Sequence, residues 1–473
     1  MRNQLLINGQ WRGAEGEGIE VLNPATGETL TSVADASLLD AKDAMRAAVE
    51  AQADWAATPP RERAELLRRS FTLVTERAED FARLITQEMG KSLTEARAEV
   101  TYGAEFLRWF SEEAPRITGR SGLLPEGTLQ HLVARRAVGP CLLITPWNFP
   151  LAMATRKLGP ALAAGCTSVI KPASATPLTT LLLGEVLLEA GVPDGVVNII
   201  TFSDHDLTDE LLSYPGLRKL SFTGSTPVGR SLMAKASNQV LRISMELGGN
   251  APLIVFDDAD LEVAVEGALA AKLRNVGQAC TAADRFIIHE SVAGEFVERL
   301  EAGMRAKKLG NGLDEAVDIG PLISAAARDE IDGLVQRAVA GGAELRCGGE
   351  ILDGPGYFYP PTLLTSVAPD AEIMTTEIFG PVAAVTTFST EQEALDIANS
   401  VDVGLAGYVF SSDQSRLYRM IDQLQVGLIA WNSGVVSNAA APFGGVKLSG
   451  LGREGSAEGI DEYLESVYVG MPA

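Results

Sequence analysis

The amino-acid sequence predicts an α/β protein built around a doubly wound parallel sheet. The chain has 473 residues, of which 46% are hydrophobic and 47 are glycine, so it can form more than one core. From about Cys141 onward, short apolar and β-branched runs alternate with helical patterns. This alternation is typical of right-handed strand–helix–strand crossovers in a parallel sheet. Such sheets bind ligands at the carboxyl ends of their strands, so the loops that follow the strands are the first candidates for a site.

The predicted elements follow one another in a simple order. A hairpin turn is expected at NPATGE, residues 23–28, and helical patterns follow at 61–89 and 93–111. Four strands then come with their helices: CLLIT at 141–145 with 151–164, TSVIK at 167–171 with 177–190, VVNII at 196–200 with 207–213, and KLSFT at 219–223 with 227–235. A second α/β block is expected from about Gly248.

Two stretches near the ends of the chain differ from this pattern. GTLQHLVARRAV at 127–138 and YLESVYV at 463–469 alternate like strands but have no partner close by in the sequence. Because unpaired strand edges readily associate, we expect these stretches to form a small sheet that joins subunits.

The charge balance and the cysteines limit the class of protein. With 39 Lys+Arg against 62 Asp+Glu the net charge is −23, which repels nucleic acid and anionic membranes, so an anionic ligand needs a local basic site. The four cysteines include no CxxC pair, which argues against a zinc site or a disulfide framework. The first residues lack the apolar core of a signal peptide, and no run reaches the roughly 18 apolar residues of a membrane span. We therefore expect a cytoplasmic protein without a metal site.

Two loops after predicted strands suit the binding of a phosphate group. In KLSFTGSTPVGR a strand leads through Gly224 and Ser225 into a helix whose free N–H groups face the loop. In KPASATP, Lys171 ends a strand, and Thr176 with Pro177 is expected to cap the next helix. An exposed loop lysine is commonly only solvated, but two such loops on neighbouring strands are more specific than one.

Two further patterns are better explained by structure than by ligand binding. SGLGREG contains G-x-G-x-x-G at Gly450, Gly452 and Gly455, but only 18 residues follow it, too few for the βαβ unit of a dinucleotide site. DDADLE at 257–262 places acidic residues where a helix opens after a strand. Such residues act as caps and as partners of the helix dipole, and we do not expect a metal there.

Three residues are candidates for catalysis, and each has a structural alternative. Cys280 lies between small residues in RNVGQACTAADRF, so it is either an accessible nucleophile or an apolar filler. Asn148 in ITPWNFP either caps the following helix or donates an amide hydrogen to an oxyanion. Glu246 in VLRISMELGGN is either a solvent-facing strand residue or a general base beside Gly248 and Gly249.

Together these motifs resemble the aldehyde dehydrogenase family along essentially the whole chain. TPWNFP, FTGSTPVG, MELGGNAP, GQAC, EIFGPV and PFGGVKLSGLGREG occur in the family's order. The resemblance implies that Cys280 is the nucleophile, that Glu246 is the general base, and that Asn148 forms the oxyanion hole with the backbone N–H of Cys280. It also implies that a nicotinamide dinucleotide binds to Thr145, Pro146, Trp147, Asn148, Lys171, Ala173, Ser174, Gly224, Ser225, Leu247, Glu377 and Phe379.

The resemblance also implies a reaction in which no histidine is needed. Nearby N–H dipoles and a cationic nicotinamide favour the thiolate of Cys280. The thiolate attacks an aldehyde, hydride transfer leaves a thioester on Cys280, and water activated by Glu246 releases the acid.

Within the family, the sequence is most similar to the succinate-semialdehyde dehydrogenases. That branch holds the substrate carboxylate with two arginines and a serine, and the matching contexts MATRK, LRNVGQAC and GVVSNAAAPFGG give Arg156, Arg274 and Ser437. The alternatives are a longer substrate such as glutarate semialdehyde, a cofactor-independent cysteine esterase, and a non-catalytic protein of the same fold.

Cofactor choice and domain organisation complete the expectations. Ser174 stands where many relatives have a glutamate, and with Lys171 it favours NADP, with NAD also possible. Two departures from the family are Ala282, which replaces a second cysteine of some relatives, and the bulky Phe202 and His205 near the adenosine end of the cofactor. We expect a homodimer or homotetramer with a dinucleotide-binding domain at 1–118 and 141–247, a catalytic domain at 248–445, and oligomerisation strands at 119–140 and 456–473.

Overall fold

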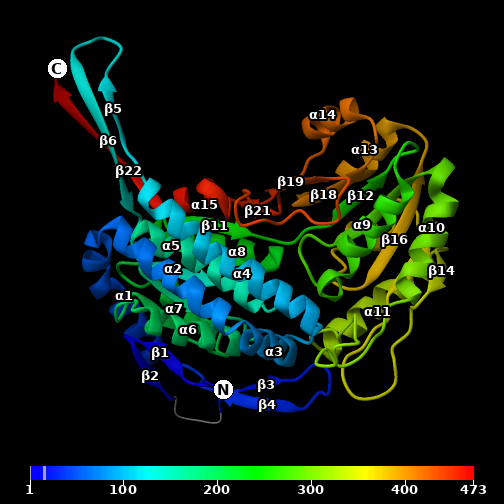
Figure 1. The fold of residues 1–473 in the computed structure, drawn as a ribbon, viewed down its shortest axis with the longest axis horizontal. Helices are drawn as coiled ribbons and strands as arrows, with labels where there is room; N and C mark the ends of the chain where they lie inside the picture. The colour runs from blue at the N-terminus through cyan, green and yellow to red at the C-terminus, as the bar shows by residue number, and fades with distance from the viewer. Residues whose placement is uncertain (1, 14–17) are drawn as a thin grey trace.

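The computed structural model describes residues 2–13 and 18–473. Two large sheets lie side by side, each covered by helices, and a narrow three-stranded sheet projects away from them (Figure 1). The predicted α/β fold is therefore confirmed.

The first sheet has the strand order β2-β1-β9-β8-β7-β10-β11-β21. Its centre is parallel and contains the four predicted strands and one more: β7 (Cys141–Ile144), β8 (Ser168–Lys171), β9 (Val197–Ile199), β10 (Lys219–Thr223) and β11 (Arg242–Glu246). Antiparallel strands close both edges: β1 (Leu5–Ile7) and β2 (Gln10–Arg12) on one side, β21 (Gly450–Leu451) on the other. Because β21 pairs with β11, the rejected glycine motif is part of this sheet's edge.

The edge hairpin β1–β2 was not predicted, although its turn has a recognisable sequence. Asn8 and Gly9 both have left-handed φ values, 50° and 71°. An Asn-Gly pair of this kind forms the tight turn that matches the twist of two antiparallel strands. Strands of three residues are too short to show an alternation in the sequence.

Helices cover both faces of the first sheet (Figure 1). The predicted crossover helices are α5 (Pro150–Ala164), α6 (Leu178–Ala190), α7 (Asp206–Leu212) and α8 (Thr226–Ala236), and the amino-terminal ones are α1 (Leu38–Ala57), α2 (Pro60–Glu76), α3 (Ala78–Met89) and α4 (Leu93–Glu113). The pattern at 61–89 forms two helices, because the chain leaves the helical conformation at Arg77. Helix α1 was not predicted; Ser37 and Asp40 begin it with a reciprocal capping box.

The predicted cap of α6 is wrong. Thr176 makes no cap, and its hydroxyl donates to the carbonyl of Trp147 at 3.2 Å. The free N–H groups of Leu178 and Thr179 instead donate to Glu88 of α3, at 2.8 and 2.9 Å. A cap supplied by a carboxylate 90 residues away leaves no local signal in the sequence.

The second sheet has the order β14-β15-β16-β13-β12-β18-β19. Its strands are β12 (Ala251–Val255), β13 (Ala283–His289), β14 (Glu344–Cys347), β15 (Thr362–Thr365), β16 (Val382–Phe388), β18 (Ala406–Phe410) and β19 (Leu428–Trp431), and its helices are α9 (Leu261–Leu273), α10 (Glu290–Arg305), α11 (Ala325–Ala340), α12 (Glu372–Thr375), α13 (Glu391–Asn399) and α14 (Gln414–Gln423). Asp260 accepts hydrogen bonds from the first N–H groups of α9, which confirms the expected cap.

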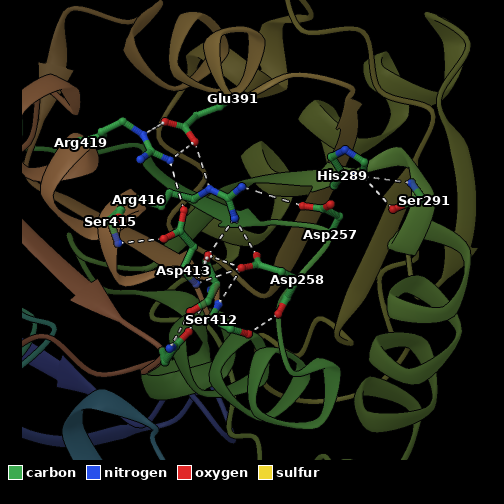
Figure 2. A network of polar contacts seen from close by, with 12 residues as sticks. Asp257, Asp258, His289, Ser291, Glu391, Ser412, Asp413, Ser415, Arg416 and Arg419 are labelled. Atoms are coloured by element: carbon green, nitrogen blue, oxygen red, sulfur yellow. Dashed lines mark hydrogen bonds and ion pairs between the residues drawn. The ribbon is translucent and has the colours of Figure 1, made fainter.

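Ion pairs occupy the carboxyl edge of this second sheet (Figure 2). Arg416 contacts Asp258, which follows β12, at 2.6 Å and Glu391, which follows β16, at 3.0 Å. Its guanidinium also lies 4.0 Å from the centre of the Phe256 ring. Within the described ranges, no group of three His, Cys, Asp or Glu side chains is placed to hold a metal ion. We interpret the cluster as structural.

The projecting sheet contains β5 (Arg120–Leu123), β6 (Leu129–Ala137) and β22 (Leu464–Pro472). The stretches predicted at 127–138 and 463–469 thus pair with each other although they are far apart in the sequence. The oligomerisation strand predicted to begin at 456 begins only at Leu464, because helix α15 (Ser456–Asp461) precedes it. The predicted turn at 23–28 joins β3 (Ile19–Leu22) to β4 (Thr29–Val33). No helix in the described part of the chain is long and apolar enough to cross a bilayer.

Candidate active site

A cavity of about 220 Å³ opens where the carboxyl edge of the first sheet meets the amino edge of the second. Glu246 ends β11 of the first sheet, and Cys280 lies three residues before β13 of the second. The cavity brings together all three predicted catalytic residues and most of the predicted cofactor residues. Its lining residues are Pro146, Trp147, Asn148, Met153, Thr223, Gly224, Ser225, Glu246, Leu247, Gly248, Cys280, Glu377 and Phe379.

Cys280 sits at the end of a turn with unusual backbone geometry. Asn275, Val276 and Gly277 have φ values of 56°, 59° and 73°, a left-handed run that is costly for a β-branched residue. Cys280 is partly exposed, unlike the other three cysteines, which are buried. Burial, followed by the negative charge of Glu246, holds the pKa of the Cys280 thiol well above its usual range. In this state the sulfur is a neutral thiol at neutral pH, and it needs a base or a nearby cation to become a thiolate.

Glu246 has the environment of a general base. Its residue is 3% exposed, which excludes the alternative of a solvent-facing strand position. Neither carboxylate oxygen has a hydrogen-bond partner within residues 2–13 and 18–473. Burial, and secondarily the charge of Glu454, raises the pKa of Glu246 to about 8. A carboxylate with a pKa close to working pH and no fixed partner can accept a proton from water.

Asn148 is not a helix cap. Helix α5 begins after Phe149, and its N–H groups at Leu151 and Ala152 donate to Glu99 of α4 at 3.0 and 3.3 Å. The Asn148 amide is buried and donates one hydrogen to the carbonyl of Gln278 at 3.0 Å. The nitrogen has a second hydrogen, and an amide that faces the cavity near Cys280 is suited to an oxyanion.

The amino end of helix α8 is open toward the cavity. Ser225 precedes the helix and makes no side-chain cap, so the first N–H groups of α8 stay available to a phosphate. Helix α8 packs closely against the residue that follows β11. A Cβ added to Gly229 of the helix would lie only 2.3 Å from a methyl carbon of the Leu247 side chain. Also in the lining of this cavity, the rings of Trp147 and Phe379 pack edge to face with 5.4 Å between their centres, and Glu377 accepts the N–H of Gly249 at 3.0 Å. This arrangement fits a dinucleotide.

Four predicted cofactor residues lie outside the cavity: Thr145, Lys171, Ala173 and Ser174. Lys171 ends β8 next to β7, and burial lowers its pKa. It has no carboxylate partner within the described ranges, and its ammonium lies 5.2 Å from the centre of the Phe202 ring. Ser174 donates to the carbonyl of Phe202 at 3.4 Å. Phe202 is 1% exposed, so the bulk that departs from the family pattern points into the core, whereas His205 is exposed.

A second cavity of about 260 Å³ contains two of the three predicted substrate residues. Arg274 and Ser437 line it together with Tyr102 and Phe149. The Arg274 guanidinium lies 5.1 Å from the centre of the Phe149 ring and has no hydrogen-bond or carboxylate partner in the part of the chain that the structure describes. An unpaired guanidinium in a cavity is suited to an anion.

Arg156 does not line this cavity. It is 1% exposed and lies behind Tyr102, whose hydroxyl it contacts. Its guanidinium is 4.1 Å from the centre of the Phe443 ring and 3.5 Å from the Glu454 carboxylate. Every residue of α5 is buried, and the predicted contact of Arg156 with the substrate stays a prediction.

Four residues around the site were not predicted: Lys91, Glu95, Glu99 and Tyr102. Glu95, Glu99 and Tyr102 recur at intervals of four and three residues along α4, so their side chains share one face. Glu95 and Glu99 accept N–H groups from the turn before Cys280 and from α5, and Tyr102 contacts Arg156. The signal in the sequence was a stripe of polar residues at helical spacing, which is normally a solvated face.

Comparison with known proteins shows the family of this chain. The profile of the aldehyde dehydrogenase family matches residues 11–469. A succinate-semialdehyde dehydrogenase of Paenarthrobacter nicotinovorans is 58% identical over 443 residues, 93% of this chain and 98% of that protein. A glutarate-semialdehyde dehydrogenase of Pseudomonas aeruginosa is 46% identical over 99% of this chain and 97% of its own length.

A solved structure also superimposes along the whole chain. The crystal structure of an NADP-dependent enzyme of E. coli has a TM-score of 0.98 and 46% identity, and the match covers 100% of this chain and 98% of that one. Sequence, fold and site geometry thus lead to one conclusion: this chain is an enzyme of the aldehyde dehydrogenase family.

Proposed function

We propose that the enzyme oxidises succinate semialdehyde to succinate with NADP, and that it also accepts NAD. The observation that supports this most strongly is the unpaired Arg274 guanidinium beside Ser437, in a cavity next to the Cys280 loop. The carboxylate of a short ω-carboxy aldehyde supplies the missing anion, with two parallel charge-assisted hydrogen bonds to the guanidinium.

The chemistry assigned to the chain's residues has two halves. The Cys280 thiol loses its proton to solvent, and the thiolate attacks the aldehyde carbon. The carbonyl electrons move to an oxyanion that receives hydrogen bonds from Asn148 and the Cys280 N–H. Loss of hydride from that carbon restores the C=O bond as a thioester. Glu246 then takes a proton from water, the hydroxide displaces the sulfur, and the acid leaves.

The residues around α8 and β8 fit the cofactor. A nicotinamide dinucleotide, when bound, supplies the acceptor for the hydride. The open amino end of α8 suits its phosphates, and Lys171 with Ser174 suits the extra phosphate of NADP, since neither brings a negative charge. The NADP dependence of the E. coli enzyme with the same fold supports this preference.

Glutarate semialdehyde is the second candidate substrate, because a relative at 46% identity acts on it. Arg274 fixes one end of the substrate and Cys280 the other, so the length between them selects the aldehyde. We further propose that the protein works in the cytoplasm, since its four cysteines are free, as is usual in a reducing compartment. We also propose that it forms a homodimer or homotetramer.

The test is nucleotide reduction with a graded series of aldehydes, with and without a terminal carboxylate, against NADP and NAD. Arg274→Ala should lower kcat/KM for succinate semialdehyde about 10- to 100-fold, since a charge-assisted hydrogen bond contributes about 1.5–3 kcal/mol. Butanal has no carboxylate and should be almost unaffected. Ser437→Ala should show the same contrast more weakly. Arg156→Ala should impair both aldehydes, because it removes the partner of the Tyr102 hydroxyl and one of the two cations beside Glu454, the other being Lys157 at 2.6 Å. Equal losses for both aldehydes in Arg274→Ala would refute the proposed substrate.

A further inference from the structure

A buried lysine, Lys91, contacts the backbone of Asn148, the proposed oxyanion donor. Lys91 is 0% exposed, and its ammonium donates to the backbone carbonyl of Asn148 at 2.9 Å. It also pairs with Glu99 at 2.5 Å and lies 4.0 Å from the centre of the Phe149 ring. Lys91 also lines the cavity that contains Arg274 and Ser437. Burying an ammonium group is costly, so a buried lysine at this point of the site needs an explanation.

Hydrogen bonds hold both the backbone carbonyl and the side-chain amide of Asn148. Its carbonyl accepts from Lys91 and also from the side-chain amide of Asn275 at 3.0 Å. Its own side-chain amide donates to the carbonyl of Gln278, which Asn275 contacts as well at 2.8 Å. The oxyanion amide, the left-handed turn before Cys280 and the lysine therefore form one connected network.

Glu99 links this network to helix α5. One of its oxygens holds Lys91, and the other accepts the N–H groups of Leu151 and Ala152. A single carboxylate thus fixes both the lysine and the start of the helix that follows Asn148. Groups that are locked by packing and by hydrogen bonds keep a donor within the narrow geometry that stabilisation of a transition state requires.

We infer that Lys91 is a positioning residue of the oxidation reaction: by gripping the Asn148 carbonyl, with Glu99 as its counter-ion, it aims the Asn148 amide at the oxyanion. This inference rests on the proposed role of Asn148 as oxyanion donor. Lys91 touches no reacting atom, so its effect passes through Asn148 and belongs to kcat more than to KM.

The test is a double-mutant cycle with Lys91→Met and Asn148→Ala. Asn148→Ala removes the side-chain amide but keeps the backbone carbonyl, so any purely structural role of Lys91 survives in it. We expect Lys91→Met alone to lower kcat about 10- to 100-fold, less than the roughly 100- to 1000-fold loss when an oxyanion donor is removed, because Asn148 itself remains. In the Asn148→Ala background, Lys91→Met should lower kcat by less than about twofold, because coupled residues are not additive.

The rate is measured at saturating succinate semialdehyde, so that altered binding of the carboxylate near Arg274 does not enter kcat. Active sites are counted by labelling of Cys280, so that unfolded protein does not enter either. Lys219→Met is the matched control: Lys219 is another lysine with 0% exposure, bonded to Ser244 at 2.5 Å and without contact to Asn148. It should lower the melting temperature and leave kcat per active site unchanged.

Glu99→Gln provides a second route if Lys91→Met does not fold. Glutamine keeps an oxygen for the α5 cap but loses the charge that holds Lys91, so kcat should fall in the wild-type background and not in Asn148→Ala. The inference would be overturned if Lys91→Met lowered kcat by the same factor in the wild type and in Asn148→Ala, or if kcat in Lys91→Met were unchanged. Either result would leave the proposed function intact. An unchanged kcat in Asn148→Ala would instead overturn the proposed oxyanion role, and this inference with it.

Discussion

Glu246 combines near-complete burial with two carboxylate oxygens that have no partner within the described ranges. Its pKa is raised to about 8, chiefly by burial. A base works only when it has lost its proton, so hydrolysis of the acyl-enzyme should accelerate as pH rises through about 8 and level off above it. Pre-steady-state measurement of the deacylation rate from pH 6 to 10 checks this. A rate that is flat across that range would show that Glu246 is not the base.

Ser174 determines the choice of cofactor in our account, because it adds no negative charge beside Lys171. Ser174→Glu should lower kcat/KM for NADP relative to NAD at least about tenfold, about 1.4 kcal/mol, through repulsion of the additional phosphate. Ser174→Gln has nearly the same size without the charge and should change the ratio much less. If the two variants gave the same NADP to NAD ratio, size rather than charge would govern the site.

At the scale of single elements, Glu88 offers a test of a buried carboxylate used as a helix cap. It holds two N–H groups of α6, it is 0% exposed, and burial raises its pKa from 4.5 to about 8. A folded-state pKa above the unfolded one stabilises the protein below about pH 4.5, and this contribution is lost as pH rises toward 8. Glu88→Gln keeps an acceptor but cannot ionise. Its melting temperature, compared with wild type, should therefore be relatively higher at pH 8 than at pH 5; a difference that is constant with pH would contradict the shift.

Elements with a local periodic signal are also the ones that the sequence predicts well. Strands β7 to β10 and their helices follow from alternating apolar runs. The cavity shared by Cys280, Glu246 and Asn148 agrees with the family resemblance of their motifs. The caps that Glu88 and Glu99 supply to α6 and α5 could not be predicted, because each depends on a contact between distant segments. The contact of Arg156 with Tyr102 of α4 is another such case, since its two residues are 54 positions apart.

For the whole molecule, the projecting sheet β5–β6–β22 remains the predicted site of subunit association. Strand register places Leu132 opposite Val469 and Gln130 opposite both Leu123 and Met471, so these four apolar side chains share one face. Leu123 is 58% exposed, and the other three are 37–40% exposed, an unusual density of exposed apolar groups for a monomer.

Leu132→Asp combined with Val469→Asp should reduce the mass in solution, as measured by light scattering, from a dimer or tetramer toward a monomer. Val240→Asp is a suitable control, since Val240 is 90% exposed and lies outside this sheet. An unchanged mass in the double variant, or a monomeric wild type, would remove the predicted role of the sheet.

The central claim is that Cys280 forms a thioester with the oxidised substrate and that Glu246 hydrolyses it. The most direct measurement is mass spectrometry of Glu246→Gln after incubation with succinate semialdehyde and NADP. We predict a succinyl group on the peptide that contains Cys280, formed with a burst of one reduced nucleotide per active site, and its absence when the nucleotide is omitted or when Cys280→Ala is combined with Glu246→Gln. A rapid burst without acylated protein, or acylation at another residue, would contradict the account.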